Sequence, residues 1–179
     1  ILPLGLLREG RKGARRADAV LLTKCPNKLE QAAIKQMTES VQHYTGKATP
    51  VFFTSINYKT PRAASGTEVA MPKKVLLISG IANADLFEAY AQKQFKVTAH
   101  IRWGDHHRYT ESDRKRVLNQ MQESGAEAVL TTEKDMVKLL QPAWAELPLY
   151  YLPIGIQFLQ QENDFRKFIE EQIQASEKA

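Results

Sequence analysis

The chain has 179 residues, of which 43% are hydrophobic and 25% are charged. These fractions are typical of a soluble globular protein, and no run approaches the ~20 apolar residues of a transmembrane helix. A single cysteine, Cys25, excludes an internal disulfide and fits a reducing compartment. The length predicts one domain of ordinary size. The chain opens Ile-Leu-Pro-Leu, with neither a methionine nor a charged leader, so we expect a piece of a longer protein and no signal peptide.

The net charge is +5, and most of the excess lies in residues 1–24, which hold six basic and two acidic side chains. A local positive field attracts anions such as phosphates, nucleic acid or an acidic lipid surface. A solvated loop that happens to be basic is the alternative interpretation, and charge alone does not decide between the two.

Residues 1–16 show no periodic pattern and are expected to be irregular. Short apolar and β-branched runs predict strands at residues 17–24, 50–56, 73–79, 95–101, 128–131 and 148–156. Helical spacing of apolar side chains predicts helices at residues 27–46, 84–94, 110–125 and 132–140 and around residues 165–173. Asn27, Thr110 and Thr132 are the expected N-caps. Pro153 should break the last strand and place it near a sheet edge.

Alternating strands and helices predict an α/β fold with a mostly parallel sheet and helices on both faces. Parallel strands point their carboxyl ends the same way, so the loops after four strands should meet at one edge. Those loops hold residues 23–26, 79–82, 105–107 and 131–135. Because polar side chains gather in them, the sequence predicts a functional site at this edge.

The most reactive stretch is residues 103–110, here called the histidine loop, which contains Asp105, His106 and His107. A carboxylate or carbonyl could fix the tautomer of one imidazole, whose other nitrogen would then handle a proton near neutral pH. The same residues could ligate a metal, but sequence neighbours rarely converge on one ion and further ligands are not evident. A third interpretation is structural, with a histidine satisfying buried carbonyls where the next helix begins.

The turn at residues 131–135, Thr-Thr-Glu-Lys-Asp, also has two interpretations. Thr132 caps the helix that follows, and Glu133 and Asp135 complement the positive end of its dipole. Alternatively, free N–H groups, the threonine hydroxyls and Lys134 form a seat for a phosphate. Two acids in the first turn oppose a bare anion and would suit a metal-bound phosphate or a basic partner better.

Seven motifs follow one another in order. They are Leu2-Pro3-Leu4-Gly5-Leu6-Leu7-Arg8-Glu9, Arg16-Ala17-Asp18, Thr23-Lys24-Cys25-Pro26, Ser79-Gly80-Ile81-Ala82, Asp105-His106-His107-x-Tyr109-Thr110, Thr131-Thr132-Glu133-Lys134-Asp135 and Leu152-Pro153-Ile154. Together they resemble tetraacyldisaccharide 4′-kinase, the lipid A biosynthesis enzyme of Gram-negative bacteria, over nearly the whole chain. The Thr-Lys-Cys-Pro motif resembles the corresponding motif in the Bacteroidetes members of that family.

The resemblance implies a P-loop kinase of two α/β lobes, whose phosphate loop and acidic motif lie upstream of the residues present here. The chain would then be the carboxyl-terminal part. Residues 1–24 would complete the first lobe and supply the strand leading from it, residues 25–72 would form a linking region, and residues 73–179 would form the second lobe. The intact protein would use ATP and Mg²⁺, whereas this chain alone is expected to bind neither and to be inactive.

The resemblance also implies roles for residues. Arg8 and Glu9 would belong to the polar rim of the active cleft, where the arginine fork suits phosphate. One of the two loop histidines, with Asp105, would assist a first-lobe carboxylate that deprotonates the 4′-hydroxyl of the sugar. The turn at residues 132–135 would shape the nucleotide or hinge side, and no metal site is expected.

The partners that the resemblance implies are the missing amino-terminal P-loop lobe, the lipid A disaccharide precursor and the membrane surface. The location would be peripheral, at the cytoplasmic face of the inner membrane. Nucleic acid is not an expected partner, because no platform of aromatic and basic residues is evident. A non-catalytic α/β module that binds an anion or a partner is the alternative reading.

Overall fold

The computed structural model describes residues 11–46, 48–66 and 71–177. Arg8 and Glu9 therefore lie outside the described residues. The chain forms two compact units, one of residues Ile1–Asn57 with Ile156–Ala179 and one of residues Tyr58–Gly155. The first is called unit 1 and the second unit 2. The single domain expected from the length is thus replaced by two.

The division at residues 24 and 72 that the resemblance implies stays a prediction. In the structure, the chain returns to unit 1 at its end. The last helix packs its aromatic side chains on a strand of unit 1, where the ring centroids of Phe165 and Phe52 are 5.0 Å apart. Phe158, just before that helix, contacts Phe165 at the same centroid distance. Aromatic burial therefore holds the carboxyl-terminal segment against residues far earlier in the sequence.

Unit 1 is built on a three-stranded sheet of order β1-β2-β8, in which β1 and β2 are parallel. Its elements are η2 (Arg11–Arg16), β1 (Val20–Leu22), α1 (Gln31–Thr45), β2 (Val51–Tyr58), β8 (Ile154–Phe158) and α5 (Glu162–Glu177), although the last residue of β2 and the first two of β8 belong to unit 2. The expected cap at Asn27 is wrong, since α1 begins later, with Glu30 at its N-cap. The backbone N–H of Cys25 donates to the carbonyl of Thr54, which keeps the chain alongside β2 beyond the end of β1.

Unit 2 contains a five-stranded sheet of order β3-β7-β6-β4-β5, parallel except for the β3–β7 pair. Its elements are β3 (Arg62–Ala63), β4 (Lys74–Ser79), α2 (Asp85–Gln94), β5 (Lys96–Arg102), α3 (Glu111–Ser124), β6 (Ala128–Thr132), α4 (Glu133–Leu139), η3 (Pro142–Trp144) and β7 (Leu149–Leu152). The expected α/β class with a mostly parallel sheet is confirmed.

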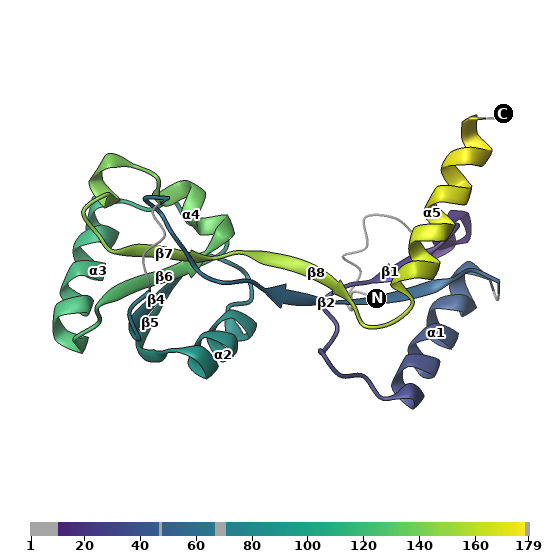
Figure 1. Ribbon diagram of the computed structural model, residues 1–179, viewed down its shortest axis with the longest axis horizontal. Helices are drawn as coiled ribbons and strands as arrows, with labels where there is room; N and C mark the ends of the chain where they lie inside the picture. Colours follow the sequence, from purple (N-terminus) through teal and green to yellow (C-terminus); the bar gives the residue numbers. More distant parts are fainter. Residues whose placement is uncertain (1–10, 47, 67–70, 178–179) are drawn as a thin grey trace. The chain divides into compact units, whose positions relative to one another are not determined.

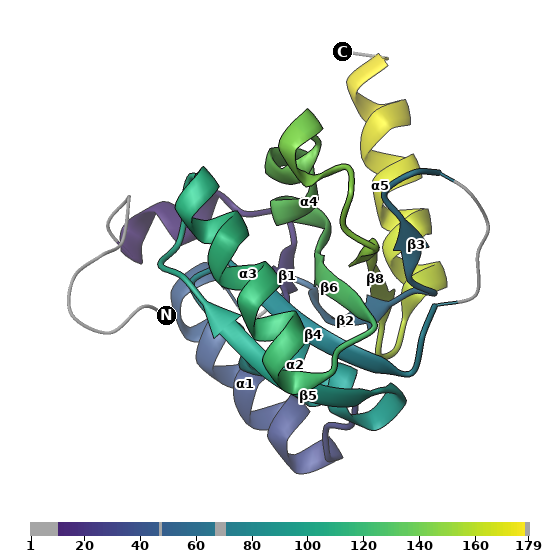
Figure 2. The ribbon, with the colours of Figure 1, turned by 90° about the vertical axis from the view of Figure 1, so that its left-hand side faces the viewer.

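Helices cover both faces of the unit 2 sheet, as the sequence predicts (Figures 1 and 2). The reason is the alternation of side chains along strand β4, which is buried from Val75 to Ser79. Leu76 points into a cluster with Val117 of α3. Leu77 points into the opposite cluster with Phe87 of α2. A strand that is apolar on both faces needs a helix on each side, and α2 and α3 supply them.

Two details of the expected sheet are corrected. Pro153 does break the last strand, but the two halves, β7 and β8, belong to different sheets. β7 is not an edge strand, because the short strand β3 pairs with it. The loop at residues 23–26 follows β1 in unit 1, so it does not share a sheet edge with the other three loops. Among the described residues, no helix is long and apolar enough to cross a bilayer.

Candidate functional site

Three of the four loops expected to meet do so at the carboxyl edge of the unit 2 sheet. The backbone N–H of Trp103 donates to the carbonyl of Ser79 at 2.8 Å, which joins the loops after β5 and β4. The backbone N–H of Gly80 donates to Asp135 Oδ2 at 2.8 Å, which joins the loops after β4 and β6. Lys134 Nζ donates to Asp105 Oδ1 at 2.8 Å, which joins the loops after β6 and β5.

The tip of the histidine loop carries Asp105 and His106. Asp105 Oδ1 accepts a hydrogen bond from the His106 backbone N–H at 3.0 Å, in addition to the bond from Lys134. The Lys134 ammonium is the main reason that the pKa of Asp105 is lowered. His106 has a φ of 61°, and its side chain is 79% exposed. Its Nε2 lies 3.5 Å from Asp105 Oδ2, so a carboxylate stands beside the imidazole ring.

His107 occupies a different environment from its neighbour. Its Nε2 lies 3.0 Å from Asp113 Oδ2. Its ring stacks on Trp103, with centroids 5.2 Å apart and an interplanar angle of 13°, and it meets the edge of Tyr109. Because an ionised carboxylate only accepts hydrogen bonds, His107 Nε2 carries the proton in this contact. The fold therefore fixes the ring of His107 and leaves the ring of His106 in solvent.

Asp113 also completes the capping box of α3, as its spacing from Thr110 predicts. The Thr110 hydroxyl accepts from the backbone N–H of Asp113, whose carboxylate accepts from the backbone N–H of Thr110. Burial tends to raise the pKa of Asp113, but the hydrogen bonds from Thr110 and His107 outweigh it, and the net shift is downward. Asp113 therefore remains ionised and available as an acceptor at neutral pH.

The turn at residues 132–135 is fixed by its own side chains. Thr132 caps α4, as predicted, by accepting from the backbone N–H of Asp135 at 3.1 Å. Asp135 is fully buried, and its carboxylate accepts from the Gly80 backbone, the Thr132 hydroxyl and Lys138 Nζ. Glu133 Oε2 accepts from the backbone N–H of Ile154 at 3.2 Å. The cap at Thr132 is the structural interpretation of the motif, and Asp135 in addition joins this turn to the loop after β4.

Gly80 stands where Asp135, His107 and Tyr109 converge. An added Cβ would lie 3.2 Å from Asp135 Oδ1 and from His107 Cβ, and 3.3 Å from Tyr109 Oη. Glycine therefore suits this position because of the close packing around it, not because of a positive φ. Burial, together with the negative charge of Asp135, raises the pKa of Tyr109, so its hydroxyl stays protonated at physiological pH.

A second polar network, not expected from the sequence, lies under the same edge. His100 Nε2 is 2.9 Å from Ser79 Oγ, and its Nδ1 is 2.8 Å from Glu88 Oε2. Arg102 pairs with both Glu88 and Asp85. Although the order Ser-His-Glu is that of a hydrolase triad, Ser79 is fully buried, so the network joins β4, β5 and α2 instead. The sequence does contain one signal for this network: His100 and Arg102 are two residues apart on one strand, so their side chains lie on the same face of the sheet.

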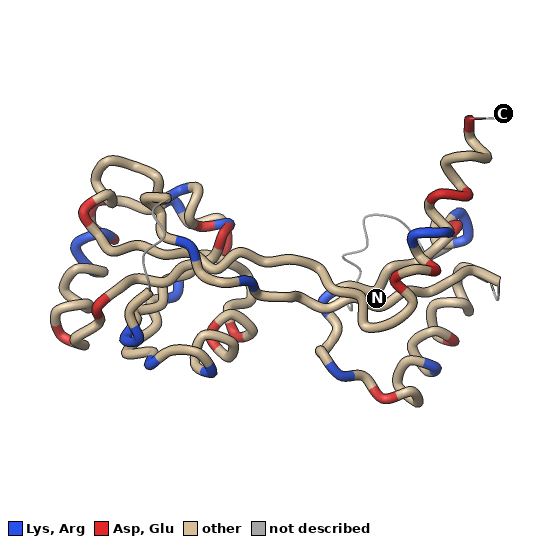
Figure 3. Tube along the Cα trace, in the orientation of Figure 1, with Lys and Arg blue, Asp and Glu red and all other residues tan. Residues whose placement is uncertain are grey.

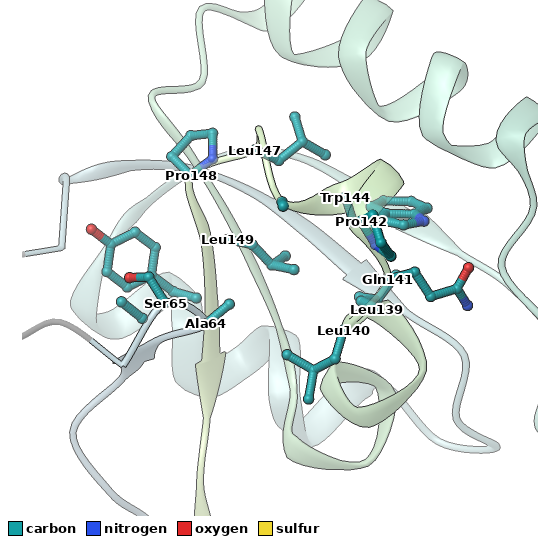
Figure 4. A pocket seen from close by; sticks show the side chains of 13 residues that line it. Ala64, Ser65, Leu139, Leu140, Gln141, Pro142, Trp144, Leu147, Pro148 and Leu149 are labelled. Atoms are coloured by element: carbon teal, nitrogen blue, oxygen red, sulfur yellow. The ribbon is translucent and has the colours of Figure 1, made fainter.

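Unit 2 also contains a pocket of about 450 Å³ (Figure 4). Its lining is largely apolar and includes Leu139, Leu140, Trp144, Leu147 and Leu149. It lies where β7 begins, whereas the histidine loop lies where β5 ends. No titratable side chain is among its lining residues apart from Tyr150. The chemistry available in unit 2 is therefore at the loop edge, not in this pocket.

Charges of both signs are interspersed along the described residues (Figure 3). Within that part of the chain, no group of three or more His, Cys, Asp or Glu side chains could hold a metal ion. The loop edge itself offers histidine, carboxylate and lysine side chains, which can act in proton transfer and in charge stabilisation.

Comparison with known proteins gives consistent matches. The family model described as tetraacyldisaccharide-1-P 4′-kinase matches residues 1–174. The tetraacyldisaccharide 4′-kinase of Flavobacterium psychrophilum is 34% identical over 98% of this chain and 51% of its own length. That of Cytophaga hutchinsonii is 34% identical over 97% of this chain and 50% of its own length. Both sources belong to the Bacteroidetes, the branch that the motif at residues 23–26 indicates.

A solved structure shares the fold. The LpxK structure from Aquifex aeolicus, described as an "apo" form in complex with ATP, matches with a TM-score of 0.56 and 21% identity. The match covers 96% of this chain and 47% of that protein. The chain thus spans about half the length of the proteins it matches.

Proposed function

We propose a function from the premise that this chain belongs to the tetraacyldisaccharide-1-P 4′-kinase family, whose model matches residues 1–174. The chain is the carboxyl-terminal part of a kinase that transfers the γ-phosphoryl group of ATP to the 4′-hydroxyl of tetraacyldisaccharide 1-phosphate in lipid A biosynthesis. Two observations support this proposal: the similar proteins are tetraacyldisaccharide 4′-kinases, and the similar solved structure is a complex with ATP. The amino-terminal half of those relatives corresponds to the partner lobe.

The observation that carries the proposal within this chain is the contrast between the two loop histidines. Phosphoryl transfer depends mainly on positioning and charge neutralisation, and the attacking hydroxyl must lose its proton. His106 has an exposed ring at the loop tip, while the Nε2 of His107 is engaged by Asp113. His106 therefore takes the proton of the sugar hydroxyl, directly or through a carboxylate of the other lobe. Asp105 stabilises the imidazolium that results.

Other side chains of the edge support this role. Lys134 donates to Asp105 and so orients the carboxylate toward His106. The turn at residues 132–135 forms the nucleotide or hinge side of the cleft, and Arg8 and Glu9, outside the described residues, line its polar rim.

The described residues do not fit a Mg²⁺ site, because they bring no three acidic or histidine side chains together. In this proposal ATP and Mg²⁺ bind chiefly through the other lobe of the intact protein, as the family resemblance implies. We expect this chain alone to bind neither and to be inactive.

We propose that the intact protein is peripheral and acts at the cytoplasmic face of the inner membrane, where its lipid substrate would be reached. The basic residues within 1–24 suit anionic lipid headgroups, which attract juxtamembrane basic segments. Nucleic acid is not a partner in this proposal.

The test compares three proteins for ATP-dependent 4′-phosphorylation of tetraacyldisaccharide 1-phosphate. They are the intact protein, this 179-residue chain, and the intact protein in which both loop histidines, His106 and His107, are changed to alanine. We expect activity in the first, none in the second and a large loss in the third. A folded but inactive intact protein, or a chain as active as the intact protein, would overturn the proposal and favour a binding module.

A further inference from the structure

Asp113, in the first turn of α3, joins both ends of the histidine loop. Its Oδ2 lies 3.0 Å from His107 Nε2, and its Oδ1 accepts from Trp103 Nε1 at 2.9 Å. Oδ2 also accepts from the backbone N–H and the hydroxyl of Thr110, each at 2.8 Å. The Asp113 side chain is only 14% exposed. One shielded carboxylate therefore collects four donors from three residues of the loop.

A helix cap alone does not require this arrangement. A capping box needs only the reciprocal bonds between Thr110 and Asp113. The bonds to Trp103 and His107 are additional, and they come from the two positions that flank the loop tip. Asp113 therefore fixes the loop at its base while leaving the tip at residues 104–106 unblocked.

The fixed base constrains the orientation of His106. Only three residues separate Trp103 from His107, and the rings of these two residues stack on each other. The backbone N–H of His107 also donates to the carbonyl of Gly104, which tightens the turn. His106 is held inside this turn at a φ of 61°, a backbone conformation that residues other than glycine seldom adopt. Such a conformation persists only where surrounding contacts over-determine it.

We propose that Asp113 is a positioning residue, which holds the base of the histidine loop through His107 and Trp103 and thereby presents His106 to the reacting hydroxyl. This role rests on the proposed function of the loop and deepens it. It assigns His107 to the support of the loop and His106 to the proton. Asp113 itself does not touch the substrate.

The matched variants are Asp113→Ala and Thr110→Ala in the intact protein. Both break the capping box of α3, but only the first removes the acceptor for His107 and Trp103. We expect Asp113→Ala to lower kcat by about tenfold to a hundredfold, the scale of a small misplacement at a reacting centre. The KM for each substrate should stay within about twofold, because positioning of the base acts on the transition state. Thr110→Ala should keep kcat within about threefold. Far-UV circular dichroism is the control for whether each variant is folded.

Equal losses of kcat in the two variants would overturn the positioning role, because they would trace the effect to the helix cap. An inactive wild type would overturn the proposed function and this role with it, whereas an active wild type with equal variants would overturn the role alone.

A measurement on the intact protein provides a second readout if Asp113→Ala fails to fold. The ¹⁵N resonances of His107 should show a proton on Nε2, and Asp113→Leu, which has nearly the size of aspartate but no acceptor, should remove this preference for Nε2. An unchanged His107 spectrum in Asp113→Leu would overturn the proposal.

Discussion

Asp135 offers the sharpest test of how the loop edge is held together. It is fully buried, and its carboxylate accepts from the Gly80 backbone at 2.8 Å, the Thr132 hydroxyl at 2.9 Å and Lys138 Nζ at 3.0 Å. Asp135→Ala leaves the N–H of Gly80 without this acceptor, which costs about 1–3 kcal/mol. Loss of a buried ion-pair partner costs about 3–5 kcal/mol, but Lys138 is 27% exposed and can reach water. We therefore expect Asp135→Ala to destabilise unit 2 by about 3 kcal/mol.

The assay is urea unfolding of the chain followed by tryptophan fluorescence. The chain has two tryptophans, Trp103 and Trp144, and both lie in unit 2, so the signal reports on that unit. A loss of about 3 kcal/mol lowers the urea midpoint by about 1–3 M. Val137→Ala on the same helix is the control, because Val137 is 71% exposed and its truncation should cost less than about 0.5 kcal/mol. If Asp135→Ala matched that control, the reasoning would be refuted.

Three further outcomes are expected. Gly80→Ala should destabilise unit 2 by about 1–3 kcal/mol through crowding, whereas Gly104→Ala, whose added Cβ meets nothing within 4 Å, should be neutral in the same assay. Acidification should lower the free energy of unfolding in two steps. Burial lowers the pKa of His100, so its contribution to the free energy of unfolding is complete above about pH 6.5 and declines below it. The pKa of Glu88 is lowered by its bonds to arginine and histidine, so its contribution to the free energy of unfolding is lost as the pH falls below about 4.5. His100→Gln should remove the first step in urea midpoints measured from pH 7.5 to 4, and a profile identical to wild type would argue against it. Phe53→Ala, at a side chain 1% exposed in β2, should cost about 3–5 kcal/mol by far-UV circular dichroism, and a change below 1 kcal/mol would contradict its place in the core.

Much of unit 2 could be predicted because its signals are local. A threonine three residues before an aspartate predicts a capped helix, and both Thr110 and Thr132 cap as expected. Apolar runs predict buried parallel strands, and parallel strands bring their following loops to one edge. The three loops of unit 2 therefore meet as the sequence indicates.

The division into units could not be predicted in the same way. An apolar run shows that a strand is buried but not which strand it will pair with. Pro153 marks a break, yet its position does not reveal that the strands on either side belong to different sheets. The placement of the last helix depends on ring contacts between Phe52 and Phe165, which are remote in sequence.

The candidate site shows the same limit at the level of side chains. His106 and His107 are neighbours of identical chemistry, so no sequence pattern separates them. Their difference arises from Trp103 and Asp113, which the turn brings to one ring and not to the other. The partnership of His100 with Ser79 likewise depends on the register between two strands. The roles of Arg8 and Glu9 stay predictions, because those residues lie outside the described part of the chain.

The most direct test of the account is the kcat/KM for 4′-phosphorylation by the intact protein carrying His106→Asn or His107→Asn separately. Loss of a positioned acid–base group typically costs about 10²–10⁴ in rate. We expect a loss of this size for His106→Asn and a smaller loss, about tenfold, for His107→Asn, which only weakens the support of the loop. Near-wild-type activity in His106→Asn, or the larger loss in His107→Asn, would contradict the assignment of the proton to His106.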